Sequence, residues 1–352
     1  MIVSIQYLRV VAASMILFFH AMSTAGAHAT MPNMLSASAA GVDIFFVISG
    51  FIMWQSTARS DPSPVEFLRR RLARIAPFYW FMTLLMCATP LISGTLSRGL
   101  VPNVEHTFAS LAFIPWHSQR DDAGIFFPAY TPGWTLNFEM SFYLMFAACL
   151  WIADRRRRFL ASIAALGAIV LIGLAAPEKS AAAWAMSPIL LEFAGGICIG
   201  VWAGTQGKLS APLAAIMMIA ALVAMASTPE AGFVGADRLI HWGIPACFIV
   251  LGAVELERHQ LVPRWPALLL AGDASYALYL THLFVIGACA IAWHALHLWT
   301  TTVGVLAFFV VTFAAGQFIA ILAHRHIELP LNESARRLLT PGNAATVAPV
   351  QP

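Results

Sequence analysis

Long apolar segments separated by short polar stretches dominate the hydrophobic pattern of this chain. A helix crosses a hydrocarbon core about 30 Å thick with about 20 apolar residues. By this criterion the sequence predicts ten transmembrane helices, at residues 7–26, 40–56, 75–93, 134–153, 159–176, 186–204, 210–227, 239–255, 274–296 and 302–324. Segment 106–116 is apolar but too short to cross, so we interpret it as re-entrant or interfacial.

The predicted fold class is therefore all-α, a polytopic membrane protein with about ten transmembrane helices. We expect a membrane domain over residues 1–330 and a short, disordered cytoplasmic tail over 331–352. We expect residues 7–26 to be retained as the first helix, because Arg9 is a weak n-region and no convincing small-residue cleavage site follows. The pattern indicates neither an internal repeat nor a second soluble domain.

The composition supports this class and excludes others. Of 352 residues, 60% are hydrophobic and only 11% are charged, whereas about 25% are charged in an ordinary soluble domain. Such a composition excludes a nucleic-acid binder, a coiled coil and a disordered scaffold. The cysteines lie apart in apolar segments, without the spacing of a disulfide framework or zinc site, at Cys87, Cys149, Cys198, Cys247 and Cys289. We therefore expect no metal.

The basic residues predict the orientation. With the N-terminus in the cytoplasm, the ten-helix map leaves only Arg98, Arg120, Lys179 and Arg238 of the 20 Lys and Arg residues on the outer side. Cytoplasmic loops carry such an excess of positive charge. Both termini are therefore predicted to be cytoplasmic.

Arg9 and His20 lie on the first predicted helix. A charge at mid-bilayer costs about 2.5–3.5 kcal/mol on insertion scales, so each polar group there needs a reason. Eleven residues correspond to three helical turns, which puts both side chains on one face, about 16 Å apart. The alternatives are a snorkelling, topology-setting arginine and a histidine satisfied by a neighbouring helix.

Two acids lie toward the outer ends of their predicted helices. Glu139 falls about one and a half turns below the outer surface, at a depth similar to that of His20. A histidine and a carboxylate at matching depth are typical of general-base chemistry. Asp43 opens the second helix, where favourable interaction with the helix N-terminus is an equally good explanation.

Arg71 and Arg74 are spaced i, i+3 before the third predicted helix and so share a face. Guanidinium groups bind phosphate bidentately, but positive-inside anchoring to anionic lipid headgroups is the simpler alternative. On the ninth helix, Ser275, Tyr279 and His282 follow i, i+4, i+7. This stripe indicates either a ligand channel or hydrogen bonding between helices.

In this order the segments resemble the acyltransferase-3 family of integral membrane acyltransferases. The start of the chain and Phe51–Trp54 are most similar to its exopolysaccharide branch. The family motifs are matched by Arg9 with His20, Gly41 to Gly50, Arg71 with Arg74, Pro77 and Tyr79, Trp134 to Glu139, Ser275 with Tyr276, Tyr279, Leu280 and His282, and Ile327 with Glu328 and Pro330. Leu329 departs from the arginine that many members have there.

The resemblance implies transfer of an acyl group, usually acetyl, from cytoplasmic acyl-CoA (acetyl-CoA) to a hydroxyl of an exported polysaccharide or its lipid-linked precursor. It places the protein in a bacterial inner membrane, with no tightly bound cofactor. By motif position the catalytic candidates are His20, Glu139 and Asp43, the CoA-binding candidates Arg9, Arg71, Arg74 and Tyr79, and the substrate-channel candidates Trp134, Ser275, Tyr276, Tyr279 and His282.

Two other classes of function compete with this enzyme. A transporter or flippase for a lipid-linked glycan would use a His/Glu pathway and predicts inverted repeats with interrupted helices. A non-catalytic partner of a polysaccharide synthase predicts that His20 is replaceable. The expected partners are acyl-CoA, the glycan, membrane lipids and a polysaccharide biosynthesis complex, with no nucleic acid.

Overall fold

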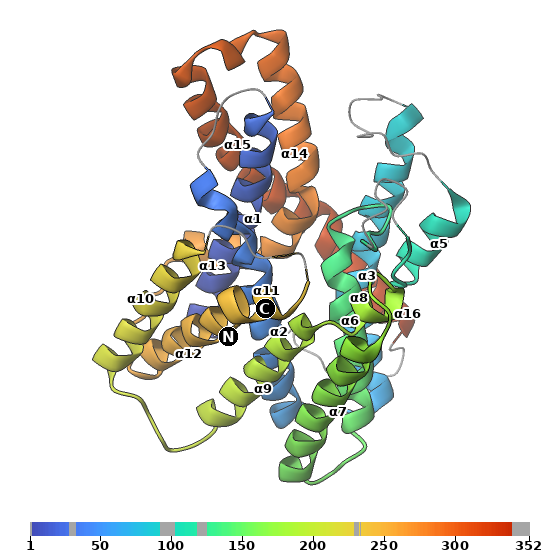
Figure 1. The fold of residues 1–352 in the computed structure, drawn as a ribbon, viewed down its shortest axis with the longest axis vertical. Coiled ribbons are helices and arrows are strands. Elements are labelled where there is room, and N and C mark those ends of the chain that lie inside the picture. The colour runs from blue at the N-terminus through green and yellow to red at the C-terminus, as the bar shows by residue number, and fades with distance from the viewer. Residues whose placement is uncertain are drawn as a thin grey trace. The chain divides into compact units, whose positions relative to one another are not determined.

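The computed structural model describes residues 2–27, 33–91, 103–117, 125–228, 232 and 234–339, and the regular elements in these ranges are all helices (Figure 1). This confirms the all-α prediction. Eight helices among the described residues are long and apolar enough to cross a membrane: Val3–Gly26, Ala37–Ser60, Pro64–Leu91, Arg155–Ala175, Ala181–Ala203, Ala236–Arg258, Ser275–Ala295 and Thr302–Leu339.

Two shorter helices occupy the remaining predicted segments. Helix α6 (Gly133–Cys149) and helix α10 (Ala211–Ser227) have 17 residues each. Each of the ten predicted segments therefore contains a helix, and the number that cross the membrane stays a prediction. The first part of segment 106–116 lies in the short helix α5 (Val104–Leu111), which Asn103 caps by accepting a hydrogen bond from the Glu105 amide at 2.8 Å.

The chain forms two compact units. Unit 1 contains residues 1–45, 206–232 and 240–327, and unit 2 contains residues 46–205, 233–239 and 328–352. The helices of unit 1 are α1 (Val3–Gly26), η1 (Asn33–Ala40), α10, α12 (Ile244–Arg258), α13 (Pro266–Asp273), α14 (Ser275–Ala295), η5 (Leu298–Thr300) and α15 (Thr302–Ala323), with the start of α2 (Gly41–Ser60).

Helix α1 organises unit 1, where it packs against α12, α13, α14 and α15. Its N-terminus is capped by an acid from α12, because the Glu257 carboxylate accepts hydrogen bonds from the amides of Val3 and Ser4, both at 2.8 Å. A carboxylate there satisfies amides that have no partner inside the helix. Helices α14 and α15 pair as a hairpin, and α10 pairs with α12 (Figure 1).

Unit 2 contains the rest of α2 and a set of helices rich in aromatic residues. They are α3 (Pro64–Ala88), η2 (Thr89–Leu91), α5, α6, α7 (Arg155–Ala175), α8 (Ala181–Ala185), η3 (Pro188–Leu190), α9 (Leu191–Ala203), α11 (Ala236–Arg238) and α16 (Leu329–Leu339). Gly50 and Gly196 bring α2 and α9 together, since a Cβ on Gly50 would lie 2.1 Å from the Phe193 carbonyl oxygen. The short helices η4 (Leu239–Gly243) and η6 (His324–Glu328) join residues of the two units.

Two element boundaries differ from the prediction. Helix α3 begins at Pro64, eleven residues before the predicted 75, because Ser63 caps it and proline suits a first helical turn. Residues 331–339 belong to helix α16, which packs against α3, although we expected a disordered tail from 331. Residues 340–352 lie outside the described part of the chain.

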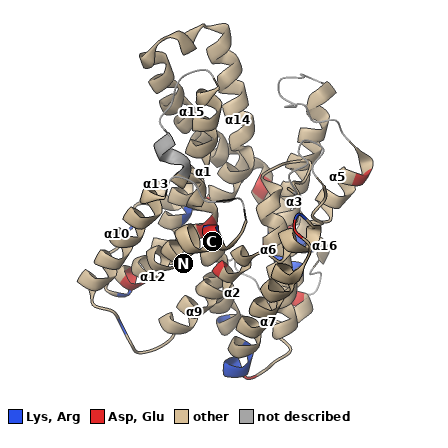
Figure 2. Cartoon of the chain, in the orientation of Figure 1, with Lys and Arg blue, Asp and Glu red and all other residues tan. Residues whose placement is uncertain are grey.

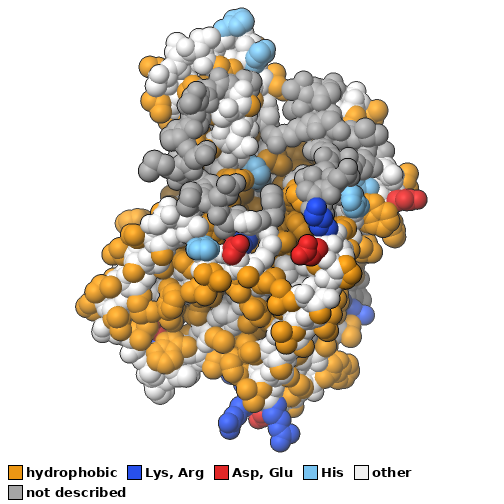
Figure 3. Space-filling view, viewed as in Figure 1, with side chains coloured by type: hydrophobic (Ala, Val, Ile, Leu, Met, Phe, Trp, Pro, Cys, Tyr) orange, Lys and Arg blue, Asp and Glu red, His pale blue; other side chains and the backbone are white. Residues whose placement is uncertain are grey.

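The surface suits a lipid environment. Hydrophobic side chains cover much of the visible surface in Figure 3, notably over α10 and α12, and Leu222, Leu306 and Val310 are among the exposed ones. Charged residues are sparse, and a basic cluster marks the start of α7, where Arg155 to Arg158 lie (Figure 2). Such large exposed apolar areas mark a membrane or protein interaction surface.

The close contact between α2 and α9 predicts an unusual response to alanine. Glycine to alanine in a helix interior normally stabilises by about 1 kcal/mol, and this is the result we expect for Gly167→Ala, where a Cβ meets nothing within 4 Å. In Gly196→Ala the Cβ would lie 2.1 Å from the Val47 carbonyl oxygen, so overpacking should cost about 1–3 kcal/mol. Thermal unfolding in detergent tests this pair, and equal shifts for both variants would contradict it.

Candidate functional site

The polar stripe on α14 faces inward in unit 1. Ser275, Tyr279 and His282 are all buried, as one helical face requires, and His282 is only 1% exposed. The His282 ring lies against His20 of α1, with ring centroids 5.0 Å apart. Two residues predicted for different roles, catalysis and substrate channel, thus form one pair of imidazoles.

The hydrogen bond of His282 determines which ring nitrogen can act as a base. Its Nδ1 lies 2.6 Å from the carbonyl oxygen of Tyr279. A carbonyl only accepts, so Nδ1 carries the proton and donates it. In the neutral ring, Nε2 therefore keeps the lone pair, and the pair contains a nitrogen able to accept a proton.

Arg9 is oriented through a short chain of polar groups in the same unit. Its guanidinium donates to the side-chain oxygen of Gln6, and the Gln6 amide donates to Asp273 at the end of α13, both at 3.1 Å. Asp273 precedes α14, the helix that His20 contacts. Arg9 is therefore linked to α13 through Gln6, while His20 contacts α14, and a shared face for Arg9 and His20 stays a prediction.

Asp43 is fully buried in the first turn of α2, which belongs to unit 1. Two residues later, the ring of Phe45 lies 6.2 Å from that of Tyr279, measured between centroids. Unit 1 thus contains a buried carboxylate, a buried tyrosine and a pair of imidazoles, of which His282 is buried and His20 is half-buried. Charge balance for His20 from Asp43 stays a prediction.

Glu139 belongs to a second polar cluster, in unit 2. Its Oε1 accepts a hydrogen bond from Ser49 at 2.9 Å and another from the Tyr143 hydroxyl one turn further along α6. Arg71 of α3 lies within electrostatic range of both Glu139 and Tyr143. The structure thus brings Glu139 together with a residue predicted to bind CoA, whereas its pairing with His20 stays a prediction.

Arg71 and Arg74 share a face of α3 but differ in their partners. Arg74 forms an ion pair with Glu328, which is 0% exposed, and Asn332 of α16 accepts from Arg74 at 3.2 Å when its amide is oriented to satisfy both its groups. Arg71 interacts instead with Tyr143 and Glu139, and only its Nε has no hydrogen-bond partner among the described residues. Binding of a CoA phosphate by Arg71 stays a prediction.

Three other candidates have differing surroundings. Tyr79 is buried eight residues beyond Arg71, about 12 Å along the helix, and its hydroxyl donates to the Ser110 carbonyl oxygen at 3.2 Å. The structure therefore does not bring Tyr79 together with Arg71. Trp134 joins an aromatic cluster in unit 2 and lies 6.2 Å from Trp184 between ring centroids. Tyr276 is half-buried at the start of α14.

The sequence interpretation did not single out the four residues of unit 2 that contact Glu139 or Arg74, namely Ser49, Tyr143, Glu328 and Asn332. Tyr143 has a detectable signal, because it lies one turn after Glu139, and Glu328 is the acid of the last matched motif. Ser49 and Asn332 carry none, because their contacts depend on how α2 and α16 pack. Within the described ranges, no three His, Cys, Asp or Glu residues cluster to hold a metal ion.

Membrane-length helices that carry buried and half-buried histidine, arginine and carboxylate groups define a polytopic membrane protein. The family model described as an acyltransferase domain matches residues 2–321 of this chain. The chain therefore belongs to this acyltransferase family, which confirms the resemblance seen in its motifs.

Several curated relatives share most of its length. The exopolysaccharide production protein ExoZ of Rhizobium meliloti (strain 1021) is 35% identical over 94% of this chain and 100% of the relative. Nodulation protein 10 of Rhizobium leguminosarum bv. viciae is 28% identical over 81% and 83%, and acyltransferase MdmB of Streptomyces mycarofaciens is 28% identical over 70% and 67%. No solved structure matches the chain.

The Arg74–Glu328 pair predicts an asymmetric loss of stability. Arg74→Ala leaves the buried Glu328 carboxylate without its cation, which should cost about 3–5 kcal/mol. Glu328→Gln should cost less, since the Arg74 side chain is 26% exposed and stays partly solvated. Unfolding in detergent measures both.

The matched control is Arg70→Ala on the same helix. Arg70 pairs with Glu66, and the two side chains are 40% and 31% exposed. Pairs of this kind contribute only about 0.3–0.5 kcal/mol. If Arg70→Ala and Arg74→Ala destabilised equally, the structural role of the Arg74–Glu328 pair would be wrong.

Proposed function

We propose that this protein transfers an acyl group, most simply acetyl, from cytoplasmic acyl-CoA to a hydroxyl of an exported polysaccharide or its lipid-linked precursor. The observation that carries the proposal is the His20–His282 pair inside a member of an acyltransferase family. The name of the ExoZ relative, an exopolysaccharide production protein, supports the choice of acceptor.

In this proposal His20 acts at the acyl carbon. The acceptor hydroxyl attacks the thioester carbonyl while His20 takes the hydroxyl proton, so a C–O bond forms and the C–S bond breaks. The CoA thiolate leaves and takes up that proton. Transfer through an acyl group held on His20 divides the same exchange into two steps.

The other candidates support these steps. Asp43, in the same unit as His20, would balance the charge of the imidazolium. Arg71 would bind a CoA phosphate, with Arg9 as a further cation, because guanidinium groups pair strongly with phosphate. Arg74 would add positive charge while it remains paired with Glu328. Glu139 would lie beside Arg71.

Loss of the His20 imidazole should abolish acylation. General-base catalysis contributes about 10²–10⁴-fold, so we expect acyl groups on the exported polysaccharide of a His20→Ala strain to fall to background by mass spectrometry. His294→Ala, an exposed histidine on α14, is the control and should retain decoration. Normal decoration with His20→Ala at wild-type membrane abundance would overturn the catalytic assignment, and a loss of export itself would favour a flippase.

Arg71→Ala should weaken donor binding more than turnover. Hydrogen bonds to charged groups contribute about 1.5–3 kcal/mol, which corresponds to a rise in KM for acyl-CoA of about 10–150-fold. Arg69→Ala, two residues earlier and exposed, should change KM little. Steady-state kinetics on protein in lipid nanodiscs measures both, and a fall in kcat with unchanged KM would contradict donor binding by Arg71.

A further inference from the structure

Helix α16 turns a polar face toward α3 within unit 2. Glu328, just before the helix, forms an ion pair with Arg74, and the Asn332 amide, four residues on, accepts from Arg74 in its satisfied orientation. Arg336 follows after another four residues, so it lies on the same face, one turn further along α16. The packing of the two helices therefore brings Arg336 to the arginines of α3.

Arg336 lies among like charges. Arg70, Arg71 and Arg74 of α3 are all within electrostatic range of its guanidinium. The nearby Glu333 acts on Arg336 less strongly than either Arg71 or Arg74 does. Because like charges at short range repel one another, the potential at Arg336 is positive, and an anion placed there would be attracted.

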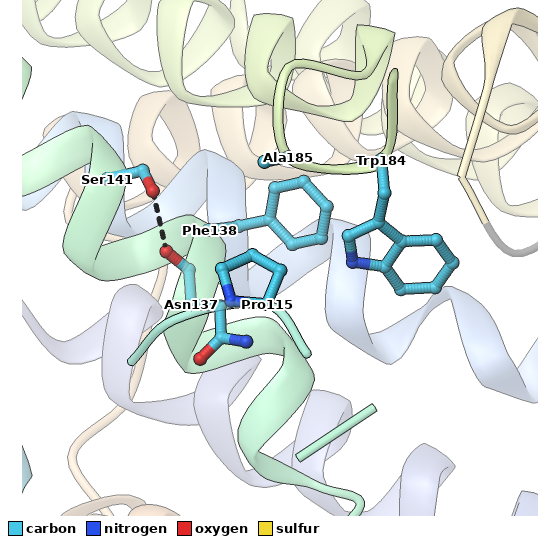
Figure 4. Close-up of a pocket in the computed structure, with 6 residues that line it drawn as sticks. All are labelled: Pro115, Asn137, Phe138, Ser141, Trp184 and Ala185. Carbon is cyan, nitrogen blue, oxygen red and sulfur yellow. Dashed lines mark hydrogen bonds between the residues drawn. The ribbon is translucent and has the colours of Figure 1, made fainter. Parts of the chain in front are cut away.

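Helix α6 adds one carboxylate to this region. Glu139 and Tyr143 share a face of α6 and interact with Arg71. Ser141 lies about 200° around the axis from Glu139, and its hydroxyl donates to the Asn137 backbone carbonyl at 2.9 Å (Figure 4). The polar groups of α6 that meet the arginines are therefore Glu139 and Tyr143, which orient Arg71.

The arginines also differ in how accessible they are. Arg71 and Arg74 are half-buried, whereas Arg336 is exposed, so an anion can reach Arg336 from the surface without opening the helix packing. The orientation predicted from the basic residues puts this end of α3 in the cytoplasm, on the side of the proposed donor. Arg336 thus forms the open edge of a basic cluster made by α3 and α16.

We infer that Arg336 binds a phosphate group of the acyl-CoA donor together with Arg71, an inference that rests on the proposed function. Coenzyme A carries a diphosphate and a separate phosphate on its ribose, so it presents more charge than one guanidinium neutralises. A guanidinium pairs bidentately with phosphate, and a polyanion between Arg336 and Arg71 would replace their repulsion by attraction. An anionic lipid headgroup offers the same phosphate chemistry, so the experiment separates the two sources.

The test changes the protein and the donor together, with the full chain in phosphatidylcholine nanodiscs. Arg336→Ala should raise KM for acetyl-CoA about tenfold or more, because hydrogen bonds to a charged group are lost. It should not change the rate with S-acetylpantetheine, which has no phosphate group. Arg336→Lys, which keeps the charge without the bidentate geometry, should lie between Arg336→Ala and the wild type.

Binding of CoA gives a readout that does not depend on transfer. CoA should raise the thermal midpoint of the wild type, and Arg336→Ala should need about tenfold or more CoA for the same shift. Without ligand, the midpoint of Arg336→Ala should stay equal or rise, because a repelling charge is removed. A lower midpoint would assign Arg336 to the structure of the α3–α16 pair and overturn the inference.

Arg337→Ala is the matched control. Arg337 is the next residue on α16, about 100° around the axis, and its side chain is 79% exposed and lies 3.9 Å from Glu333. This variant removes the same charge but should keep the wild-type KM and CoA shift. Equal losses in Arg336→Ala and Arg337→Ala would overturn the inference, since they would indicate attraction by net charge alone.

Two further outcomes separate the lipid and the proposed function. If Arg336→Ala changed only the stabilisation gained from phosphatidylglycerol in the nanodiscs, with an unchanged KM for acetyl-CoA, the inference would be wrong and the ligand would be a lipid headgroup. If the wild type bound CoA through Arg336 but transferred no acyl group, the proposed function would be wrong and the phosphate site would stand.

Discussion

A charge buried between these helices must be compensated inside the protein, because lipid offers no hydrogen bonds. The Arg74–Glu328 ion pair meets this requirement and links α3 to the residue just before α16, the helix that packs against α3. Glu257 meets it by capping the N-terminus of α1. The protein loses stability strongly when one partner of a buried ion pair is removed. The few charges of this chain therefore hold together elements that lie far apart in the sequence.

The same constraint explains which parts of the fold could be predicted. Apolar length located the helices, because a membrane imposes that length directly. It missed the first turns of α3 and all of α16, where Ser63 and Asn332 act through caps and contacts that hydropathy does not record. The polar start of α3 can be recognised from its capping residue. Helix α16, in contrast, can be recognised only from its packing against α3.

For the candidate site, the sequence predicted which side chains share a face of one helix, but it did not predict which residues of other helices they contact. The spacing of Ser275, Tyr279 and His282 predicted a shared face, since helical periodicity holds whatever the surroundings. The contact of His20 with His282 depends on α1 packing against α14, which no spacing within either helix indicates. Depth in the bilayer is a single coordinate, so a similar depth for Glu139 and His20 did not identify Ser49 and Tyr143 as the hydrogen-bond partners of Glu139.

The buried polar groups also differ in how far the chain itself supplies their partners. Arg74 has Glu328 and Asn332, and the oxygen of Glu139 has two hydroxyl donors, so these groups have partners within the chain. Both side-chain atoms of Asn137 lack hydrogen-bond partners among the described residues, and so does Arg71 Nε, although the Arg71 guanidinium interacts with Tyr143 and Glu139. A buried polar atom without a partner lowers stability, so each one needs an explanation, and an ordered water or ion that satisfies it is one such explanation.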